Sequence, residues 1–259
     1  MLIDLSGRSA LVCGSSQGIG AASAKMLAEL GCQVTCLARN EDNLKNIVSG
    51  LKGSNHHLIA ADVGERTELS QKIQNHINEY GPFEILINNS GGPPGGPIAS
   101  AEAEAFQDAF EKHLLANALL ASLVIPGMKD KKFGRIVNII STSVKAPLTG
   151  LGVSNTIRGA VANWSKTLSN ELASFGITVN NVLPGATETQ RLSSIITNKA
   201  KKVGCSEDEM AKRMRNEIPA KRFGKPEEVA AAIGFLCSPA AAYINGINIP
   251  VDGGRTPCL

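Results

Sequence analysis

A strand, a glycine-rich turn and a helix follow one another over residues 9–30, and this unit constrains the fold more than any other stretch. An apolar run at residues 10–13 enters a turn with glycines at positions 14, 18 and 20, and apolar residues at helical spacing follow. A helix that begins in such a turn directs unpaired backbone N–H groups and its positive dipole end outward. Both features suit a pyrophosphate, although glycine-rich turns also serve as plain connections. The unit therefore predicts a nucleotide site at the end of a strand.

The three glycines have separate expected roles in that site. Gly14 allows the tight turn, Gly18 allows a phosphate to approach the backbone, and Gly20 allows the helix to pack closely on the strand. The residues of this turn that we expect to contact the cofactor are Gly14, Ser16, Gln17, Gly18, Ile19 and Gly20.

Length, composition and charge exclude several classes of protein. A chain of 259 residues with 43% hydrophobic content can form one large core, so a single domain over residues 1–259 is expected. The longest apolar run, residues 118–125, is too short to span a membrane, and a net charge of +3 is too weak to indicate nucleic-acid binding. The six cysteines lack the spacing of a zinc site or a disulfide framework. These features predict a cytoplasmic protein without a bound metal.

Strand-like and helix-like segments alternate along the whole chain. We expect further strands at residues 33–38, 57–61, 84–88, 135–140, 177–185 and 247–251. We expect helices near residues 41–50, 65–80, 101–128 and 164–175, over residues 191–217, and from Pro226 onward. Regular βα alternation of this kind is typical of an α/β fold. The predicted architecture is a doubly wound sheet of seven parallel strands with helices on both faces.

The glycine spacing GxxxGxG resembles that of the short-chain dehydrogenase/reductase family, and the resemblance extends from Gly7 to Gly254. Residues 88–91 (NNSG), directly after a predicted strand, are similar to the Asn-Asn-Ala-Gly motif of that family. Cys13 occupies a position that is usually threonine in the family. The resemblance is greatest to 3-oxoacyl-(acyl-carrier-protein) reductases. It implies a Rossmann fold, a nicotinamide dinucleotide cofactor, and a carbonyl or alcohol substrate such as an acyl thioester.

The residue after the second predicted strand favours NADP over NAD. An acidic side chain at this point would accept a hydrogen bond from the ribose 2′-hydroxyl of NAD, whereas arginine accommodates a 2′-phosphate. Arg39 occupies this region and Ala38 precedes it, although a solvated surface arginine is the alternative reading. The resemblance also places Asp62 and Val63 against the adenine ring, but Asp62 is also suited to capping the next helix.

The resemblance implies several more contacts to the cofactor. The loop at residues 184–189 corresponds to the family's loop over the nicotinamide, and residues 189–217 correspond to a mobile lid over the substrate. The further cofactor-binding residues implied in this way are Asp62, Val63, Asn89, Ser90, Gly91, Arg158, Pro184, Gly185, Thr187 and Thr189.

The expected catalytic residues depart from the family pattern. The resemblance assigns Ser141 to the substrate carbonyl and Asn117 to a water in a proton relay, but Ser154 and Arg158 stand where the family has tyrosine and lysine. Hydride delivery to a carbonyl leaves an alkoxide that must receive a proton. Serine is a far weaker acid than tyrosine, and arginine cannot transfer a proton as lysine can. The catalytic set of Asn117, Ser141, Ser154 and Arg158 therefore lacks an obvious proton donor.

Several alternatives remain open on the sequence alone. Lys145 or His113 could replace the missing acid, but a surface lysine and a packed histidine explain them more simply. The chain could also be a catalytically impaired dinucleotide-binding protein that acts as a sensor or oligomer subunit, or a lyase or isomerase that uses the cofactor only structurally. The excess of basic residues over residues 189–223 fits either an anionic acyl carrier or a solvated helix face. The resemblance suggests a homotetramer or homodimer built through the helices that contain Asn117 and Arg158.

Overall fold

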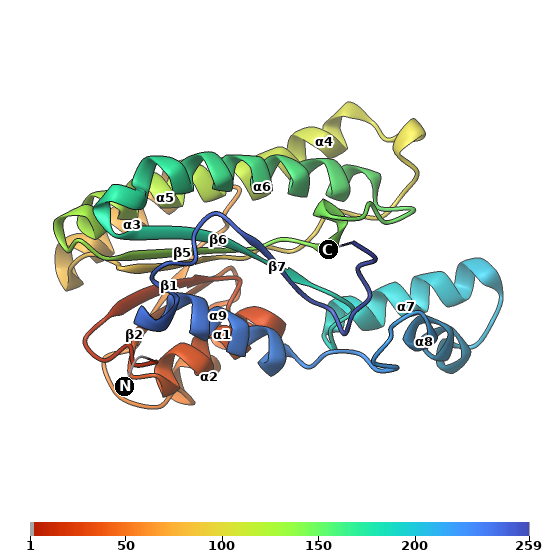
Figure 1. Cartoon of the computed structure of the whole chain (residues 1–259), viewed down its shortest axis with the longest axis horizontal. Helices are drawn as coiled ribbons and strands as arrows, with labels where there is room; N and C mark the ends of the chain where they lie inside the picture. Colours follow the sequence, from red (N-terminus) through yellow and green to blue (C-terminus); the bar gives the residue numbers. More distant parts are fainter. Residues whose placement is uncertain (1–2, 259) are drawn as a thin grey trace.

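The computed structural model describes residues 3–258, which form a single sheet of seven parallel strands with helices on both faces (Figure 1). The strand order is β3-β2-β1-β4-β5-β6-β7, so the chain reverses its direction across the sheet between β1 and β4. This arrangement confirms the predicted doubly wound Rossmann-like domain. The strands are β1 (Ser9–Cys13), β2 (Gln33–Ala38), β3 (His57–Ala60), β4 (Ile85–Asn88), β5 (Gly134–Ile139), β6 (Ile177–Pro184) and β7 (Asn248–Val251).

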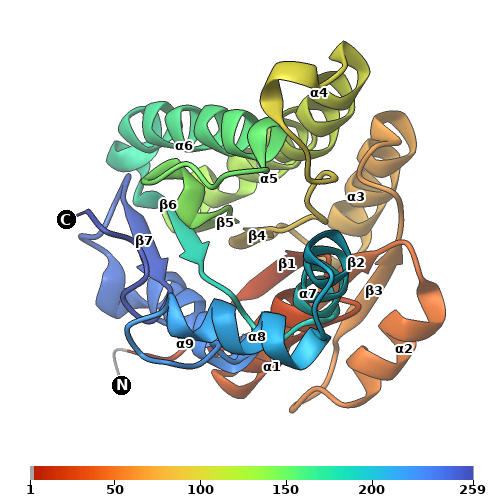
Figure 2. The same cartoon turned by 90° about the vertical axis from the view of Figure 1, so that its right-hand side faces the viewer.

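Two apolar layers bury the faces of the sheet, as is usual when parallel strands are covered on both sides. On one face α1 (Gly18–Glu29), α2 (Glu41–Ser49) and α9 (Pro226–Cys237) pack against side chains such as Val12 and Ile87. On the other face α3 (Arg66–Tyr80), α5 (Ala116–Asp130) and α6 (Gly152–Leu172) pack against side chains such as Leu11 and Leu86. Figure 2 shows the two groups of helices on opposite sides of the strands.

Two helices, α7 (Gln190–Val203) and α8 (Glu207–Asn216), lie outside these layers, beyond the end of β6 (Figures 1 and 2). They share a small apolar cluster of their own, which includes Leu192, Met210 and Met214. This helical pair replaces the single helical stretch expected over residues 191–217. Because its apolar side chains contact each other more than the main core, the pair is a separate packing unit at the edge of the sheet.

The helix expected over residues 101–128 is interrupted. It consists of α4 (Ala103–Phe110), a π-helical turn (Glu111–Leu115) and α5, without a break in the chain direction. The side chain of Tyr243, between α9 and β7, is fully exposed. In the described part of the chain no helix is long and apolar enough to cross a membrane.

Four asparagines form a ladder of side-chain hydrogen bonds across β4, β5, β6 and β7. Asn88 Nδ2 donates to Asn138 Oδ1 (2.8 Å), Asn138 Nδ2 donates to Asn181 Oδ1 (3.0 Å), and Asn181 Nδ2 donates to Asn248 Oδ1 (2.8 Å). Each bonded pair is also a register pair of the sheet. Asn138 Nδ2 makes a further contact with Ser165 Oγ on α6 at 3.2 Å. Buried amides need such partners, so the ladder satisfies most of these amide groups inside an otherwise apolar layer, although Asn88 Oδ1 has no partner among the described residues.

Removal of the central member of this ladder should destabilise the protein strongly. In Asn138→Ala the buried amides of Asn88 and Asn181 lose a partner, and each unsatisfied group costs about 1–3 kcal/mol. We therefore expect the free energy of unfolding in urea to fall by about 2–5 kcal/mol. Asn248→Ala, at the half-buried end of the ladder, is the matched control and should cost about 1 kcal/mol. Equal losses in the two variants would show that the ladder contributes nothing beyond ordinary packing.

Candidate active site

The residues predicted to bind the cofactor and substrate gather at the carboxyl ends of the strands. In a parallel sheet these ends share one edge, and ligands bind there where the chain reverses direction. The loops that leave β1, β2, β3, β4, β5 and β6 all emerge at this edge, and Figure 2 views the molecule from the side of α7 and α8, which lie in front of it.

The glycine turn is packed so closely that its glycine positions leave no room for a side chain. Gly14 and Gly18 have φ of +59° and +55°, in the left-handed region that other residues avoid. A Cβ at Gly20 would lie 2.1 Å from Gly14 O, and one at Gly14 would lie 2.7 Å from Asn89 Nδ2. The first turn of α1 therefore rests directly on the backbone of the β1 loop and on the loop after β4.

Asn89 holds the two loops together. Its Nδ2 lies 3.3 Å from both Cys13 O and Gly14 O and donates to them. The backbone N–H of Asn89 contacts the Cys13 thiol, and this contact partly offsets the burial that raises the pKa of Cys13 to about 12. Cys13 therefore stays a protonated thiol, in the position where the family usually has threonine.

The start of α1 fits the phosphates of a dinucleotide. Its N-cap residue Gln17 makes no side-chain capping bond, so the N–H groups of the first turn have no partner from that side chain. The Ser16 side chain is half-buried, the Gln17 side chain is exposed, and the Ile19 side chain is half-buried. Ser15, in contrast, is buried, and its backbone N–H donates to Leu37 O at 3.3 Å. A rigid glycine turn with free N–H donors can hold phosphate oxygens through its backbone.

Arg39 stands at the end of β2 with its guanidinium largely in solvent. Its side chain is 80% exposed, and its one ion pair is a loose contact with Asp62 at 3.7 Å. Exposed pairs of this kind contribute little stability, so the guanidinium can exchange this partner for a phosphate. Asp62 Oδ1 accepts a hydrogen bond from Gly64 N (2.9 Å) and so also fixes the turn before α3, while Val63 packs against the apolar layer. Asp62 therefore stabilises the turn before α3 but does not cap that helix, whose N-cap residue is Glu65, and its contact with the adenine ring stays a prediction.

The loop between β6 and α7 covers the glycine turn from the opposite side. A Cβ at Gly18 would lie 3.2 Å from Thr189 Cγ2, so Thr189 already contacts that turn. Thr189 Oγ1 accepts from Leu192 N at 3.4 Å and thereby caps α7. Thr187 is buried, and Gly185 is close to Asp252, since a Cβ there would lie 2.7 Å from the Asp252 Cα. Pro184 ends β6 and is half-buried, as are Gly185 and Thr189.

The predicted catalytic serines come from two different elements. Ser141 follows β5 and is half-buried, and its Oγ accepts a hydrogen bond from Ser143 N (3.1 Å). Ser154 lies in the first turn of α6 and is also half-buried. Asn117 lies in the first turn of α5, directly after the π-helical turn, with 9% of its surface exposed. π-Helical turns often occur at functional sites, and this one places two polar residues, His113 and Asn117, in the interior.

His113 is held as a neutral, buried side chain. Its Nδ1 lies 2.6 Å from Ser90 Oγ, and 2% of its surface is exposed. Burial, followed by the charges of Arg158 and Lys112, lowers the pKa of His113 to about 3. A histidine of this kind carries no imidazolium proton at neutral pH and cannot act as the missing acid. The structure therefore supports the packed-histidine reading and gives Ser90 a structural role beside Gly91, which is exposed.

Arg158 is a buried cation beside the strand that leads to Ser141. Its Nη1 donates to Ile139 O at 2.9 Å, 8% of the residue is exposed, and its Nε is buried without a partner among the described residues. Burial, followed by the charge of Arg191, lowers the pKa of Arg158 to about 10. Arg158 therefore remains protonated at neutral pH and presents a fixed positive charge at the carboxyl edge.

The sequence analysis missed Arg191 as a site residue and assigned it only to the lid. Its Nη2 donates to Pro93 O (2.9 Å), which ties the start of α7 to the loop after β4. A basic residue in the first turn of a helix is disfavoured by the helix dipole. That unfavourable placement is a sequence signal that could have indicated a role for Arg191. Asn138 and Asn181 were also missed, because two asparagines within strands give no sign of the ladder until the register is known.

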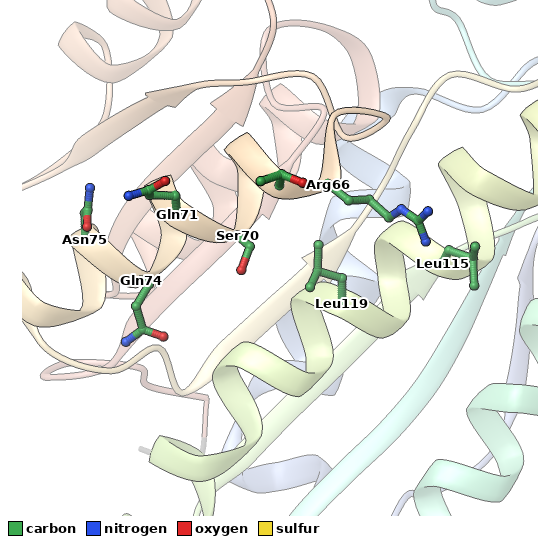
Figure 3. A pocket seen from close by; sticks show the side chains of 8 residues that line it. Arg66, Ser70, Gln71, Gln74, Asn75, Leu115 and Leu119 are labelled. Atoms are coloured by element: carbon green, nitrogen blue, oxygen red, sulfur yellow. The ribbon is translucent and has the colours of Figure 1, made fainter.

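A groove between α3 and α5 lies on a different part of the surface. Its lining combines polar residues of α3 with Leu115, the last residue of the π-helical turn, and Leu119 in the first turn of α5 (Figure 3). The side chains on this groove are Arg66, Thr67, Ser70, Gln71, Gln74, Asn75, Leu115 and Leu119. None of them belongs to the predicted site, and among residues 3–258 no group of three or more His, Cys, Asp or Glu could hold a metal ion.

Comparison with known proteins identifies the family. The family model described as enoyl-(acyl carrier protein) reductase matches residues 14–256. The chain belongs to the short-chain dehydrogenase/reductase family. This assignment confirms the resemblance noted in the glycine turn and in the loop after β4.

Relatives of the chain are reductases of several kinds. The chain is 34% identical to the 3-oxoacyl-[acyl-carrier-protein] reductase FabG of Vibrio cholerae over 97% of this chain and 98% of that protein. It is 32% identical to the NADPH-dependent reductase BacG of Bacillus subtilis over 96% and 98% of the two chains. Among solved structures, L-sorbose reductase from Gluconobacter frateurii in complex with NADPH and L-sorbose superposes with a TM-score of 0.92 at 30% identity, and the match covers both chains fully.

The buried histidines should make the protein sensitive to mild acid. The pKa of His113 is about 3 and burial lowers that of His76 to about 4, whereas a histidine in the unfolded chain titrates near 6.5. Below pH 6.5 the unfolded state therefore binds protons that the folded state does not, and stability falls by up to about 1.4 kcal/mol per pH unit for each histidine. Urea unfolding between pH 6.5 and 5 should show this slope. In His113→Asn we expect about half of it, and an unchanged slope would contradict the assignment.

Proposed function

We propose that the protein is an NADP-dependent oxidoreductase that reduces the carbonyl of a 3-oxoacyl thioester-like substrate, or oxidises the matching alcohol, in an atypical active site. The observation that carries the proposal is the buried, charged Arg158 beside the strand that leads to Ser141, at the same edge of the sheet as a glycine turn whose N–H groups receive no side-chain cap from Gln17. Relatives named as NADPH-dependent and 3-oxoacyl reductases support the choice of cofactor and substrate class.

The cofactor is proposed to lie along the carboxyl edge. The glycine turn and the first turn of α1 hold the pyrophosphate, Arg39 binds the 2′-phosphate, and Asp62 and Val63 border the adenine. Asn89, Ser90, Gly91 and the loop over residues 184–189 complete the set proposed for this site. When bound, the nicotinamide supplies the hydride.

Ser141 and Arg158 are proposed to act on the substrate and the cofactor, respectively. The Ser141 hydroxyl donates a hydrogen bond to the substrate oxygen and so polarises the carbonyl. Arg158 donates from the free side of its guanidinium to the nicotinamide ribose and stabilises negative charge that develops nearby, because its positive charge is retained at neutral pH. Arg158 does not transfer protons in this role.

The proton is proposed to come from water, Ser154 or Lys145, since His113 is excluded by its low pKa. Asn117 is suited to holding such a water, because its amide lies in the first turn of α5 directly after the π-helical turn. A weak donor predicts slow protonation of the alkoxide, by a factor of about 10² to 10⁴ relative to a dedicated acid. The second candidate function is a dinucleotide-binding sensor or oligomer subunit without turnover. It is favoured by the weak acidity of Ser154, which stands where the family has tyrosine.

Further features belong to this proposal. Residues 189–217, which contain α7 and α8, act as the substrate lid of a single NADP-binding domain spanning residues 1–259. The protein assembles as a homotetramer or homodimer through the helices that contain Asn117 and Arg158, and it works in the cytoplasm without nucleic acid or membrane partners. The basic residues of α7 and α8 suit an anionic acyl carrier.

Arg39 should determine the preference for NADPH. In Arg39→Ala the 2′-phosphate loses a charge-assisted hydrogen bond, and NADPH binding should weaken by about 1.5–3 kcal/mol, while NADH binding stays the same. Fluorescence titration of both nucleotides measures this difference. Arg66→Ala is the control, because Arg66 is another partly exposed arginine, paired with Glu111 at 3.2 Å, and lies outside the proposed site. Equal affinity of the wild type for NADH and NADPH would identify Arg39 as an ordinary surface residue.

Restoring the family's acid should raise turnover. Ser154→Tyr with Arg158→Lys supplies a tyrosine whose pKa is lowered by an adjacent ammonium, so reduction of a 3-oxoacyl thioester should accelerate roughly 10²-fold. Each single change should do little, because the two groups act as a unit. Steady-state oxidation of NADPH measures the effect, and Ser141→Ala should slow the wild type further.

The outcome of that experiment separates the two candidate functions. If the wild type and the double variant are both inactive on a broad panel of carbonyls while NADPH still binds tightly, the oxidoreductase proposal fails and the binding-protein alternative stands. If the wild type is already fast, at about 1 to 10³ per second, another group supplies the proton. Lys145→Ala would then be compared with the wild type across pH.

A further inference from the structure

Two guanidinium groups border one small space above Gly92. A Cβ at Gly92 would lie 3.4 Å from Arg191 Nη2 and 3.8 Å from Arg158 Nη2, so both nitrogens lie within 4 Å of the same point. The two arginines come from different elements, the first turn of α7 and the middle of α6. Backbone carbonyls fix each of them, Pro93 O for Arg191 and Ile139 O for Arg158.

No carboxylate of the described chain balances these charges. Within residues 3–258 neither guanidinium is within 4.0 Å of an aspartate or glutamate oxygen, although ten other ion pairs occur there. Arg158 is 8% exposed, and its Nε has no partner. Burial of an unpaired charge is costly, and a second cation nearby adds to that cost. The positive charge of Arg191 lowers the pKa of Arg158, because repulsion between the two cations disfavours the protonated form of Arg158.

The loop that borders this space leads to the start of α6. The loop that contains Gly92 continues to Gly96, which pairs with Leu151 and whose N–H donates to Gly150 O at 2.8 Å. Leu151 precedes the first turn of α6, which carries Ser154. The loop after β4 therefore runs from Asn89, which is bonded to the glycine turn, to the start of α6, and Gly92 lies between these two contacts along the chain.

We propose that Arg158 and Arg191 together bind a carboxylate of the substrate, so that the protein acts on a carbonyl compound with a carboxylate next to the reacting carbonyl. This inference rests on the proposed oxidoreductase function and replaces the thioester of the proposed substrate by a carboxylate. Arg158 then binds the carboxylate through Nη2, which borders the space above Gly92, and keeps Nε for the nicotinamide ribose. Two planar guanidinium forks match the two oxygens of a carboxylate. A carboxylate fits better than a phosphate on a long carrier arm, because Arg158 is buried next to the strand that leads to Ser141, where the reacting end of a substrate must lie.

The first test measures binding of a carboxylate probe to the full-length protein saturated with NADP. Benzoate, with benzamide as its uncharged counterpart, is titrated by calorimetry. We expect benzoate to bind and benzamide not to bind. Arg191→Gln should weaken benzoate at least tenfold, and Arg191→Lys should weaken it less, because the charge remains and the fork is lost. Arg66→Gln removes a partly exposed arginine charge outside the proposed site and should leave the affinity unchanged.

Gly92→Ala gives a second variant that leaves both charges in place. Gly92 does not have a positive φ, and the added methyl group would be in ordinary van der Waals contact, so the fold should tolerate it. The methyl group occupies the space between the guanidinium groups, and benzoate binding should again weaken at least tenfold. Benzoate affinity that is unchanged in both Arg191→Gln and Gly92→Ala would overturn the proposal.

The second test compares benzoylformate with its methyl ester as substrates for NADPH oxidation. We expect kcat/KM for the acid to exceed that for the ester at least tenfold, and Arg191→Gln to remove the difference by slowing only the acid. Reduction of both at equal rates, unaffected by Arg191→Gln, would overturn the carboxylate site and leave the oxidoreductase function intact. Failure of both substrates with benzoate binding still dependent on Arg191 would support the anion site and count against the function. If Arg191→Gln instead weakens NADPH tenfold and leaves benzoate unchanged, the pair serves the cofactor's phosphates and the proposal is wrong.

Discussion

The first turn of α1 packs on the bare backbone of the loop that leaves β1, and the position of the whole cofactor edge depends on this contact. A single Cβ at Gly20 would overlap Gly14 O, and Asn89 bonds the same loop from the other side. Because Thr189 also contacts Gly18, three loops far apart in the sequence are fixed relative to one another. Side-chain-free positions thus set the geometry in which backbone N–H groups are presented to a phosphate.

Positive charge without a partner is the second organising feature of this edge. Arg39 is loosely paired and exposed, while Arg158 is buried beside Arg191 with no carboxylate near either. Several arginines elsewhere on the surface instead have close acidic neighbours, such as Arg222 with Glu228 at 2.6 Å. Two guanidinium groups that approach one point of this edge without a carboxylate partner suit an anionic ligand there, and the unbound state bears the cost in stability.

Much of the fold could be predicted from the sequence, because local patterns fix it. All seven strands begin and end within one residue of their expected positions, since apolar runs bounded by turns define buried parallel strands. The interruption of the helix at Glu111–Leu115 could not be predicted, because a π-helical turn leaves no periodic signal over so few residues. The approach of Arg191 to Arg158 was equally inaccessible. It depends on how α7 folds back over the loop after β4, which is a tertiary contact between residues far apart in the chain.

The asparagine ladder has a consequence for how the second half of the sheet finds its alignment. If β5 slipped by one residue, Asn138 would face the opposite layer, and if it slipped by two, the amide would meet apolar partners on both sides. Apolar strands alone discriminate poorly against the two-residue slip, because valine and isoleucine are nearly interchangeable along β5 and β6. Both errors break hydrogen bonds of the ladder, so the ladder fixes the register of β4, β5, β6 and β7. The remaining strands, β1, β2 and β3, are aligned by apolar packing and by the glycine turn.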